Sequence, residues 1–267
     1  MSDAFFERDG EKFIPTELTR GPWDPGAQHA GPPAALLGRA IEGIGAEDDD
    51  AESPPTRIGR VTYEILRSVP IAPLTVATGV LRPGRRVELV EARLIDADAE
   101  VMRATAWRLR PEGVELPAGL PGGEPPPGPE TGSEGDFFPT GQDVGYHTAM
   151  EYRFVAGAFL DPGPATVWMR MRHPLIAGEE PSALQRVLIA ADSGNGVSAT
   201  LDWRRFLFIN VDLTVQLHRL PEGEWVCLDA ITIPEPTGVG LADTALHDVR
   251  GPIGRATQTL LVAERDG

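Results

Sequence analysis

The sequence predicts an α+β fold of two similar halves, in each of which an antiparallel sheet wraps around one central helix. A segment rich in proline and glycine divides the 267 residues near the middle. On both sides of it, a helical segment is followed by several strand-like runs. One helix among half-polar strands can cover the apolar face of a curved sheet. A parallel α/β sheet would need a helix between most strands, and the spacing leaves no room for these helices.

The dividing segment covers residues 113–138, with the sequence GVELPAGLPGGEPPPGPETGSEGDFF. Proline lacks a backbone N–H, so this composition is incompatible with the interior of a helix or strand. We therefore interpret the segment as a linker. The predicted organisation is an N-terminal half over residues 1–112, the linker over 113–138, and a C-terminal half over 139–267.

The first half is expected to contain one helix and four strands. The helix runs from Pro32 to Ile44, because proline suits the first turn and the apolar residues after it recur at helical spacing. The turn at Arg82–Arg85 separates two strands as in a β-hairpin. The predicted strands are Thr56–Leu66, Leu74–Leu81, Arg86–Ile95 and Val101–Leu109.

The second half repeats this order. Its helix is expected over Pro181–Asp192, after two shorter strands, Met150–Phe154 and Thr166–Arg172. A short identity supports duplication, since Arg103–Ala106 reads RATA and Arg255–Gln258 reads RATQ. The strands after the helix are predicted at Asn210–Arg219, Trp225–Ile233, Val239–His247 and Ile253–Val262.

Charge and cysteine content narrow the range of partners and compartments. The chain has 24 Lys and Arg against 40 Asp and Glu, a formal charge of −16. This balance disfavours nucleic acid and anionic membrane surfaces, so we expect neither as a partner. A single cysteine, Cys227, rules out an internal disulfide and is typical of a reducing compartment. With no signal peptide and no long apolar stretch in the sequence, we predict a cytoplasmic protein.

Familiar catalytic and cofactor motifs are missing from the sequence. It contains no Gly-x-Ser-x-Gly, no His-Glu-x-x-His and no Gly-x-x-x-x-Gly-Lys. The glycines at Gly194 and Gly196 imitate a dinucleotide-binding turn. They follow a segment that fits a helix better, and there they serve as a helix stop. We therefore expect no cofactor and no metal.

Asp192 is the most informative polar residue. Helical spacing places it at the end of an apolar stripe that includes Leu188. A carboxylate in such a position is costly unless it is hydrogen bonded, and the helix C-terminus disfavours its negative charge. Two interpretations stay open: a general base, or a cap on the adjoining glycine-rich turn.

Three further polar residues are candidates for a site. Strand alternation places Gln258 on an otherwise apolar face with Ala256 and Leu260, where it either anchors the strand or holds a water. Asn210 begins a predicted strand, on a face that is solvated or lies in a site. His29 precedes the first helix and either acts in acid–base chemistry or fixes its loop.

Several segments resemble the acyl-CoA thioesterase II family and its actinobacterial-type relatives, whose fold is a double hot-dog. The likeness runs from about Phe5 to Val262. It implies an acyl-CoA substrate, thioester hydrolysis without a cofactor, and a possible homodimer. The segments that carry the resemblance are Gly21–Glu42, Ala190–Asp192, Val211–Arg219 and Thr257–Gln258.

In that family an Asp, a Thr and a Gln hold the hydrolytic water. The resemblance implies that Asp192 and Gln258 fill the first and last roles, while Asn210 stands at the threonine position. An asparagine amide both donates and accepts hydrogen bonds, so a water can still be held. Two alternatives remain: a hot-dog enoyl-CoA hydratase or dehydratase with His29 as base, and a non-catalytic acyl-CoA-binding protein.

Overall fold

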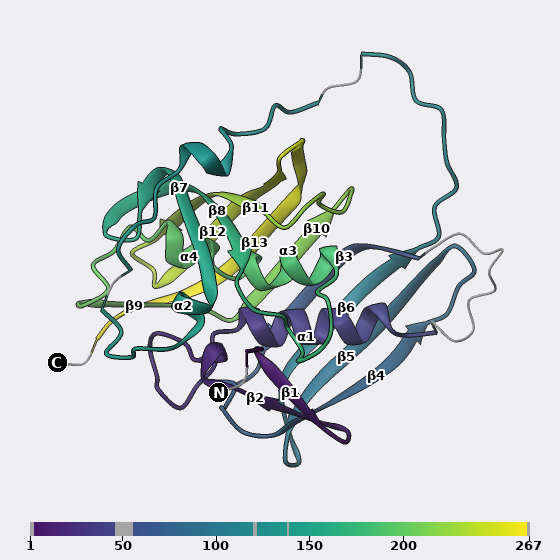
Figure 1. The fold of residues 1–267 in the computed structure, drawn as a ribbon, viewed down its shortest axis with the longest axis horizontal. Helices are drawn as coiled ribbons and strands as arrows, with labels where there is room; N and C mark the ends of the chain where they lie inside the picture. The colour runs from purple at the N-terminus through teal and green to yellow at the C-terminus, as the bar shows by residue number, and fades with distance from the viewer. Residues whose placement is uncertain (1–2, 46–55, 120–121, 138, 266–267) are drawn as a thin grey trace.

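The computed structural model describes residues 3–45, 56–119, 122–137 and 139–265 (Figure 1). Residues 120, 121 and 138 of the predicted linker lie outside the described residues, as do 1–2, 46–55 and 266–267 of the predicted halves. The fold is α+β, as predicted. A 13-stranded sheet, in which the named strand pairs are antiparallel, carries the helices on it.

The N-terminal half begins with a hairpin, continues through a helix and ends in a meander. Its elements are β1 (Phe6–Asp9), β2 (Lys12–Pro15), η1 (Glu17–Thr19), α1 (Gly31–Glu42), β3 (Arg57–Ile65), β4 (Leu74–Arg82), β5 (Val87–Asp96) and β6 (Ala99–Leu109).

The C-terminal half repeats the order of hairpin, helix and meander. A short 3₁₀ turn, η2 (Pro129–Thr131), lies in the predicted linker before it. Its elements are α2 (Tyr146–Ala149), β7 (Met150–Ala158), β8 (Asp161–Met171), α3 (Ala183–Ala191), α4 (Gly194–Val197), β9 (Phe206–Asn210), β10 (Asp212–Leu217), β11 (Val226–Pro234), β12 (Val239–Asp248) and β13 (Gly251–Glu264).

The order of strands in the sheet shows the duplication directly. It reads β1-β2-β4-β5-β6-β3 and then β10-β13-β12-β11-β8-β7, so the second half mirrors the first. The two halves join where β3 pairs with β10, with Thr62 opposite Thr214. The strand β9 lies off this path and pairs with β13. A single continuous sheet therefore holds both halves in a fixed relation.

The helices α1 and α3 pack against each other on the same side of the sheet (Figure 1). Their approach is close enough to require glycine: a Cβ at Gly38 would lie 2.2 Å from Cδ1 of Leu188, and one at Gly31 would lie 2.5 Å from the carbonyl oxygen of Ile189. The apolar faces of both helices are buried in the core. The local sequence supports this arrangement, because Pro32 and Pro33 occupy the first turn of α1.

The observed elements differ from the predicted ones in three respects. The hairpin of β1 and β2 was not predicted. Each strand has only four residues, and an alternation of apolar and polar residues cannot be recognised over so short a run. The short helices α2 and α4 were missed for the same reason. The predicted strand Asn210–Arg219 corresponds to β10 at Asp212–Leu217, but Asn210 instead ends β9, a separate strand that was not predicted, and Val211 lies between the two.

The interruption at Val211 coincides with a one-residue shift of register against β13, since Asn210 pairs with Leu260 but Thr214 pairs with Thr257. The carboxylate of Asp212 accepts the backbone N–H of Thr259 at 2.6 Å, taking the place of a backbone acceptor. The side chains that point inward therefore change parity: they have even residue numbers in β9, as in Phe208 and Asn210, and odd numbers in β10, beginning with Leu213. Asn210 ends β9 and points inward; it does not begin a strand on a face shared with Asp212.

The second part of the predicted linker is attached to the C-terminal half. The indole Nε1 of Trp168 donates to the carbonyl oxygen of Pro127 at 2.7 Å. Ser133 and Phe154 exchange two backbone hydrogen bonds. The division at 113–138 stays a prediction, but residues 127–137 are part of the surface of the second half rather than a free tether.

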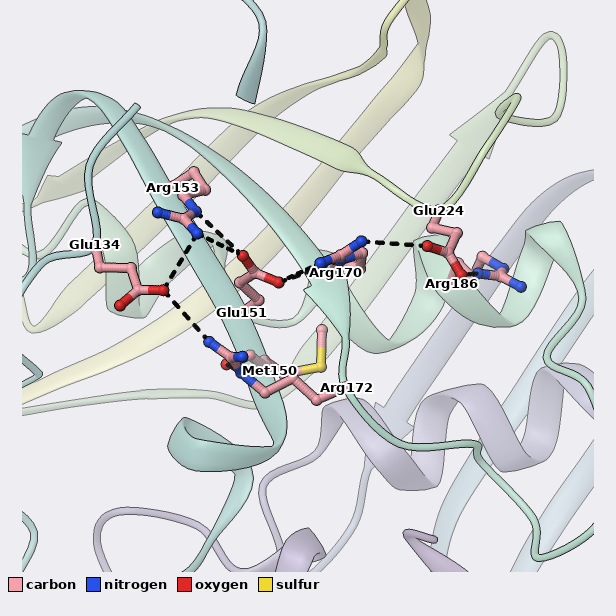
Figure 2. Close-up of polar contacts among 8 residues, drawn as sticks. All are labelled: Glu134, Met150, Glu151, Arg153, Arg170, Arg172, Arg186 and Glu224. Atoms are coloured by element: carbon pink, nitrogen blue, oxygen red, sulfur yellow. Dashed lines mark hydrogen bonds and ion pairs between the residues drawn. The ribbon is translucent and has the colours of Figure 1, made fainter. Parts of the chain in front are cut away.

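Charged side chains reinforce this attachment (Figure 2). Glu134 of the predicted linker forms ion pairs with Arg153 and Arg172. Next to it, the buried Glu151 accepts hydrogen bonds from Arg153 and from Arg170. Burial works against the charged form of Glu151, but the hydrogen bonds from the two arginines outweigh it and lower the pKa of this carboxyl.

Across the described ranges, no helix combines the length and the apolar character needed to cross a bilayer.

Candidate active site

A cavity of about 420 Å³ lies where the two halves meet. Residues between 21 and 30 and between 65 and 69 contribute its lining from the N-terminal half. From the C-terminal half the lining comes from α2, β7, α4, β9 and β13 and from Asp192, which directly follows α3. Its wall is mostly apolar. The aromatic side chains that line it are Trp23, Phe137, Tyr146, Tyr152, Phe159 and Phe208.

Asp192 lies in the wall of this cavity at the C-terminal end of α3, as the sequence predicts. The residue is only 7% exposed, so its oxygens depend on protein partners. Oδ1 accepts a hydrogen bond of 2.8 Å from Nδ2 of Asn210 and one of 3.2 Å from Nε2 of Gln258. The structure thus brings together Asp192, Gln258 and Asn210, the three residues to which the family resemblance assigns the water.

Gln258 lies on the inward face of β13 with Ala256 and Leu260, and is 2% exposed. Its Oε1 accepts the backbone N–H of Asn195 at 3.0 Å. This contact orients the amide so that its NH₂ group faces Asp192, where it also donates to the backbone carbonyl at 3.1 Å. These contacts show that the side chain is anchored, and its role in holding a water stays a prediction.

Asn210 reaches the site from the end of β9. Its Nδ2 also donates to the backbone carbonyl of Asp212 at 3.3 Å, which fixes the amide beside the strand interruption. The expectation of a solvated face for Asn210 is wrong, because the change of parity at Val211 turns this side chain inward. One oxygen of Asp192 consequently has two amide donors from two different strands.

His29 faces the other oxygen of Asp192. Its Nδ1 lies 3.1 Å from Oδ2, and its ring stacks on Tyr146 with centroids 3.8 Å apart and planes 11° from parallel. Burial lowers the pKa of His29, and the nearby charge of Asp192 opposes this shift without reversing it. The same Nδ1 accepts the backbone N–H of Gly31 at 3.1 Å.

Tyr146 is a member of the site that the sequence did not reveal. Its hydroxyl donates to the carbonyl oxygen of Ile189 at 2.7 Å and lies 2.9 Å from Oγ of Ser193. Burial raises the pKa of Tyr146 well above its ordinary value, so the phenol stays neutral. A tyrosine in a four-residue helix has no periodicity to distinguish it, and the adjacency of Ser193 to Asp192 was the only available signal.

The chemistry of the site is that of a carboxylate held by amides next to an imidazole. Among the described residues, no group of three His, Cys, Asp or Glu side chains is placed to hold a metal ion. A carboxylate in the wall of a cavity, with one oxygen held by amides, can remove a proton from a bound water.

Solved structures share this fold over nearly their whole lengths. A candidate thioesterase II from Thermobifida fusca YX superposes with a TM-score of 0.73 at 18% identity, covering 97% of this chain and 95% of that chain. A hot-dog protein from Alicyclobacillus acidocaldarius gives 0.69 at 16% identity, with 99% and 97% covered. The acyl-CoA thioesterase II TesB2 from Mycobacterium marinum gives 0.63 at 12% identity, with 98% and 97% covered. These likenesses confirm the predicted double hot-dog fold.

Sequence comparisons place the chain in a family. A search of curated proteins finds no match. The profile of the acyl-CoA thioesterase N-terminal domain matches residues 19–109, and the profile of the acyl-CoA thioesterase C-terminal domain matches residues 122–262. The two profiles leave residues 110–121 between them, and the second one begins inside the predicted linker. The chain therefore belongs to the acyl-CoA thioesterase family and is a thioester hydrolase of the double hot-dog type.

Proposed function

We propose that this protein hydrolyses an acyl-CoA thioester to a free acid and coenzyme A, with Asp192 as the general base. Gln258 and Asn210 orient the Asp192 carboxylate and the attacking water. The observation that carries this proposal is the pair of amide hydrogen bonds to Oδ1 of Asp192 in the wall of the cavity. They leave Oδ2 as the oxygen that takes up a proton.

The reaction needs no group beyond this site and a water. The oxygen of the water bonds to the thioester carbon, and Asp192 accepts a proton from this water in the same step. The tetrahedral intermediate then collapses, the carbon–sulfur bond breaks, and Asp192 returns the proton to the leaving sulfur. The carboxylate is regenerated and the products are the acid and the free thiol.

The cavity has a lining suited to an acyl chain and a charged carrier. The aromatic side chains Phe137, Tyr152 and Phe159 contact one another in its wall and offer an apolar surface to an acyl group. Arg67 is the one arginine or lysine in the described lining, and its side chain is exposed to solvent. We assign it to the phosphates of coenzyme A, which need a local positive charge on an acidic protein.

The test is thiol release from a panel of acyl-CoA substrates of increasing chain length. We expect turnover by the wild type, and a loss of at least a hundredfold in kcat for Asp192→Ala, because the base is removed. Asp202→Ala is the matched control, since that carboxylate is bound to Arg204 and lies outside the cavity lining. Wild-type rates in both Asp192→Ala and Gln258→Ala would refute the assignment.

One observation keeps a second reaction in view. His29 lies against Asp192, an arrangement that also suits addition of water to an enoyl-CoA double bond with His29 as base. That activity would change the absorbance of an enoyl-CoA without releasing thiol, and His29→Ala would abolish it. A non-catalytic acyl-CoA binder would instead show tight binding and no turnover in either assay.

Pairing into a homodimer is part of the same proposal. The outer face of the C-terminal half carries a stripe of exposed apolar side chains, and the register places Ile233 opposite Leu241 and Val239 opposite Leu261. Such a stripe is more typical of a contact surface than of a solvated one. Light scattering should report twice the chain mass for the wild type and a single mass for Leu241→Lys.

We also propose a cytoplasmic location, supported by the free and buried Cys227.

A further inference from the structure

We propose that His29 is a positioning residue. When Asp192 takes up its proton, His29 releases the backbone N–H of Gly31, which can then donate a hydrogen bond to the substrate. The inference rests on the proposed hydrolysis and goes beyond it. It concerns a residue that lies outside the set of Asp192, Gln258 and Asn210.

Two contacts meet at one atom. Nδ1 of His29 accepts the backbone N–H of Gly31 at 3.1 Å and lies 3.1 Å from Oδ2 of Asp192. An imidazole nitrogen has one lone pair in the plane of the ring, so it cannot accept two hydrogens along different directions. Only one of the two contacts is a hydrogen bond at any moment. The contact with Gly31 requires the neutral tautomer of His29 whose hydrogen is on Nε2, and in that tautomer with an ionised Asp192 neither Oδ2 nor Nδ1 carries a hydrogen for the other.

Neighbouring groups fix the position of the His29 ring, so that Nδ1 cannot move away from either partner. It stacks on Tyr146, whose hydroxyl is fixed by the carbonyl of Ile189. The backbone N–H of His29 donates to the carbonyl of Thr19 at 2.8 Å. The position of Gly31 is equally constrained, since a Cβ there would lie 2.5 Å from the same carbonyl of Ile189. The three groups are therefore held in register before any substrate binds.

The first turn of α1 explains why this one amide matters. Pro32 and Pro33 follow Gly31 and have no backbone N–H. Ala34 already donates its N–H to the carbonyl of Ala30. Gly31 directly follows the cavity-lining residues His29 and Ala30, and we assign its N–H to the developing oxyanion; in the ionised site this N–H is bound to His29.

Proton uptake by Asp192 reverses the arrangement. When water gives its proton to Oδ2, the new O–H donates to Nδ1 of His29 and occupies its lone pair. The Gly31 N–H then loses its acceptor and is available to the carbonyl oxygen, which becomes negative in the same step. When the proton passes to the leaving sulfur, Nδ1 accepts the Gly31 N–H again. No proton is gained or lost by His29 over the cycle.

Three variants test the kinetic consequence. His29→Phe keeps the ring stacked on Tyr146 but removes the acceptor for the Asp192 O–H; we expect kcat to fall about 10- to 100-fold, the effect of one hydrogen bond to an ionisable group, with KM nearly unchanged. His29→Asn restores an acceptor and should recover part of this loss. His147→Phe is the matched control, because His147 also stacks on an aromatic ring but lies outside the cavity lining.

Either of two kinetic results would overturn the proposal. One is a His29→Phe kcat within twofold of wild type. The other is a rise in KM without a change in kcat, which would show that His29 only shapes the cavity.

Nuclear magnetic resonance of the ligand-free protein tests the switch without relying on turnover. Asp192→Asn places an amide donor at the position of the protonated carboxyl, so the Gly31 amide and the His29 Nδ1 resonances should both shift. Unchanged resonances would refute the coupling. If the wild type hydrolyses no thioester but Asp192→Asn still produces these shifts, the proposed function is refuted and the coupling is not.

The pH profile supplies a further readout. The titratable groups that face His29 are Asp192 at the end of α3 and Tyr146 of α2, and Asp24 and Arg67 line the same cavity. Protonation of Nδ1 would direct a hydrogen to Asp192 and block the base. The acid limb of kcat should therefore move in His29→Asn and stay in place in His147→Phe.

Discussion

The amide of Asn210, the last residue of β9, donates a 2.8 Å hydrogen bond to the carboxylate of Asp192. The bond exists because β9 and β10 are separate strands. In an unbroken strand Asn210 would face the same way as Asp212, whose carboxylate binds Thr259 instead. The strand interruption is thus a feature of the candidate site.

Removal of the Asn210 amide should slow hydrolysis. In Asn210→Ala one of the two donors to Oδ1 of Asp192 is lost, and we expect kcat to fall about tenfold. Asn210→Asp should be slower still, because it places a second carboxylate against the first. Gln216→Ala, an exposed amide on β10, is the control and should keep wild-type kcat. An Asn210→Ala enzyme at full rate would remove this residue from the mechanism.

Arg67 should affect affinity for the carrier and not the chemistry. Arg67→Ala is expected to raise KM for an acyl-CoA about two- to fivefold, the range for an exposed ion pair, with little change in kcat. The same acyl group on N-acetylcysteamine lacks phosphates, so its KM should not change. Arg85→Ala, in a turn outside the cavity lining, is the control. Equal effects on both substrates would place the phosphates elsewhere.

The stability of the protein should fall on mild acidification, in part through His29. Burial lowers the pKa of His29 below that of an unfolded histidine, so between these two values the unfolded chain binds more protons. The free energy of unfolding therefore decreases as pH falls through this window. The pKa values of His147 and His247 are lowered in the same direction by burial. Melting temperatures at about pH 7.5 and about pH 5.5 should differ less in His29→Phe than in the wild type. A difference as large as that of the wild type would contradict the assignment.

The charged cluster of Figure 2 should stabilise the second half. Glu151→Gln keeps the shape but removes the charge between Arg153 and Arg170, and we expect a loss of about 1–3 kcal/mol in the free energy of unfolding near neutral pH. The pKa of Glu151 is lowered in the folded protein, so its contribution exists above the pKa of an unfolded glutamate and disappears as pH falls through the lower folded value. Urea unfolding at several pH values measures this. Glu224→Gln, an exposed partner of Arg170, should cost less.

Local sequence patterns predicted most of the fold. The helical spacing over Pro32–Ile44 corresponds to α1 at Gly31–Glu42, and Pro181–Asp192 contains α3 at Ala183–Ala191. These segments are long enough for periodicity to be legible. The four-residue strands β1 and β2 are not, and their pairing depends on a turn at Gly10, which adopts a left-handed conformation with φ of 62°.

For the candidate site, the sequence by itself determined which polar residues stand in apolar surroundings. Asp192 and Gln258 were identified because helix and strand periods are local properties. Only the tertiary structure decided which polar groups meet. Gln258 contacts Asp192 across 66 residues, and His29 approaches the same carboxylate from the other half of the chain. The parity change at Val211 and the packing of α1 on α3 arise from contacts between distant segments, and no local pattern encodes such contacts.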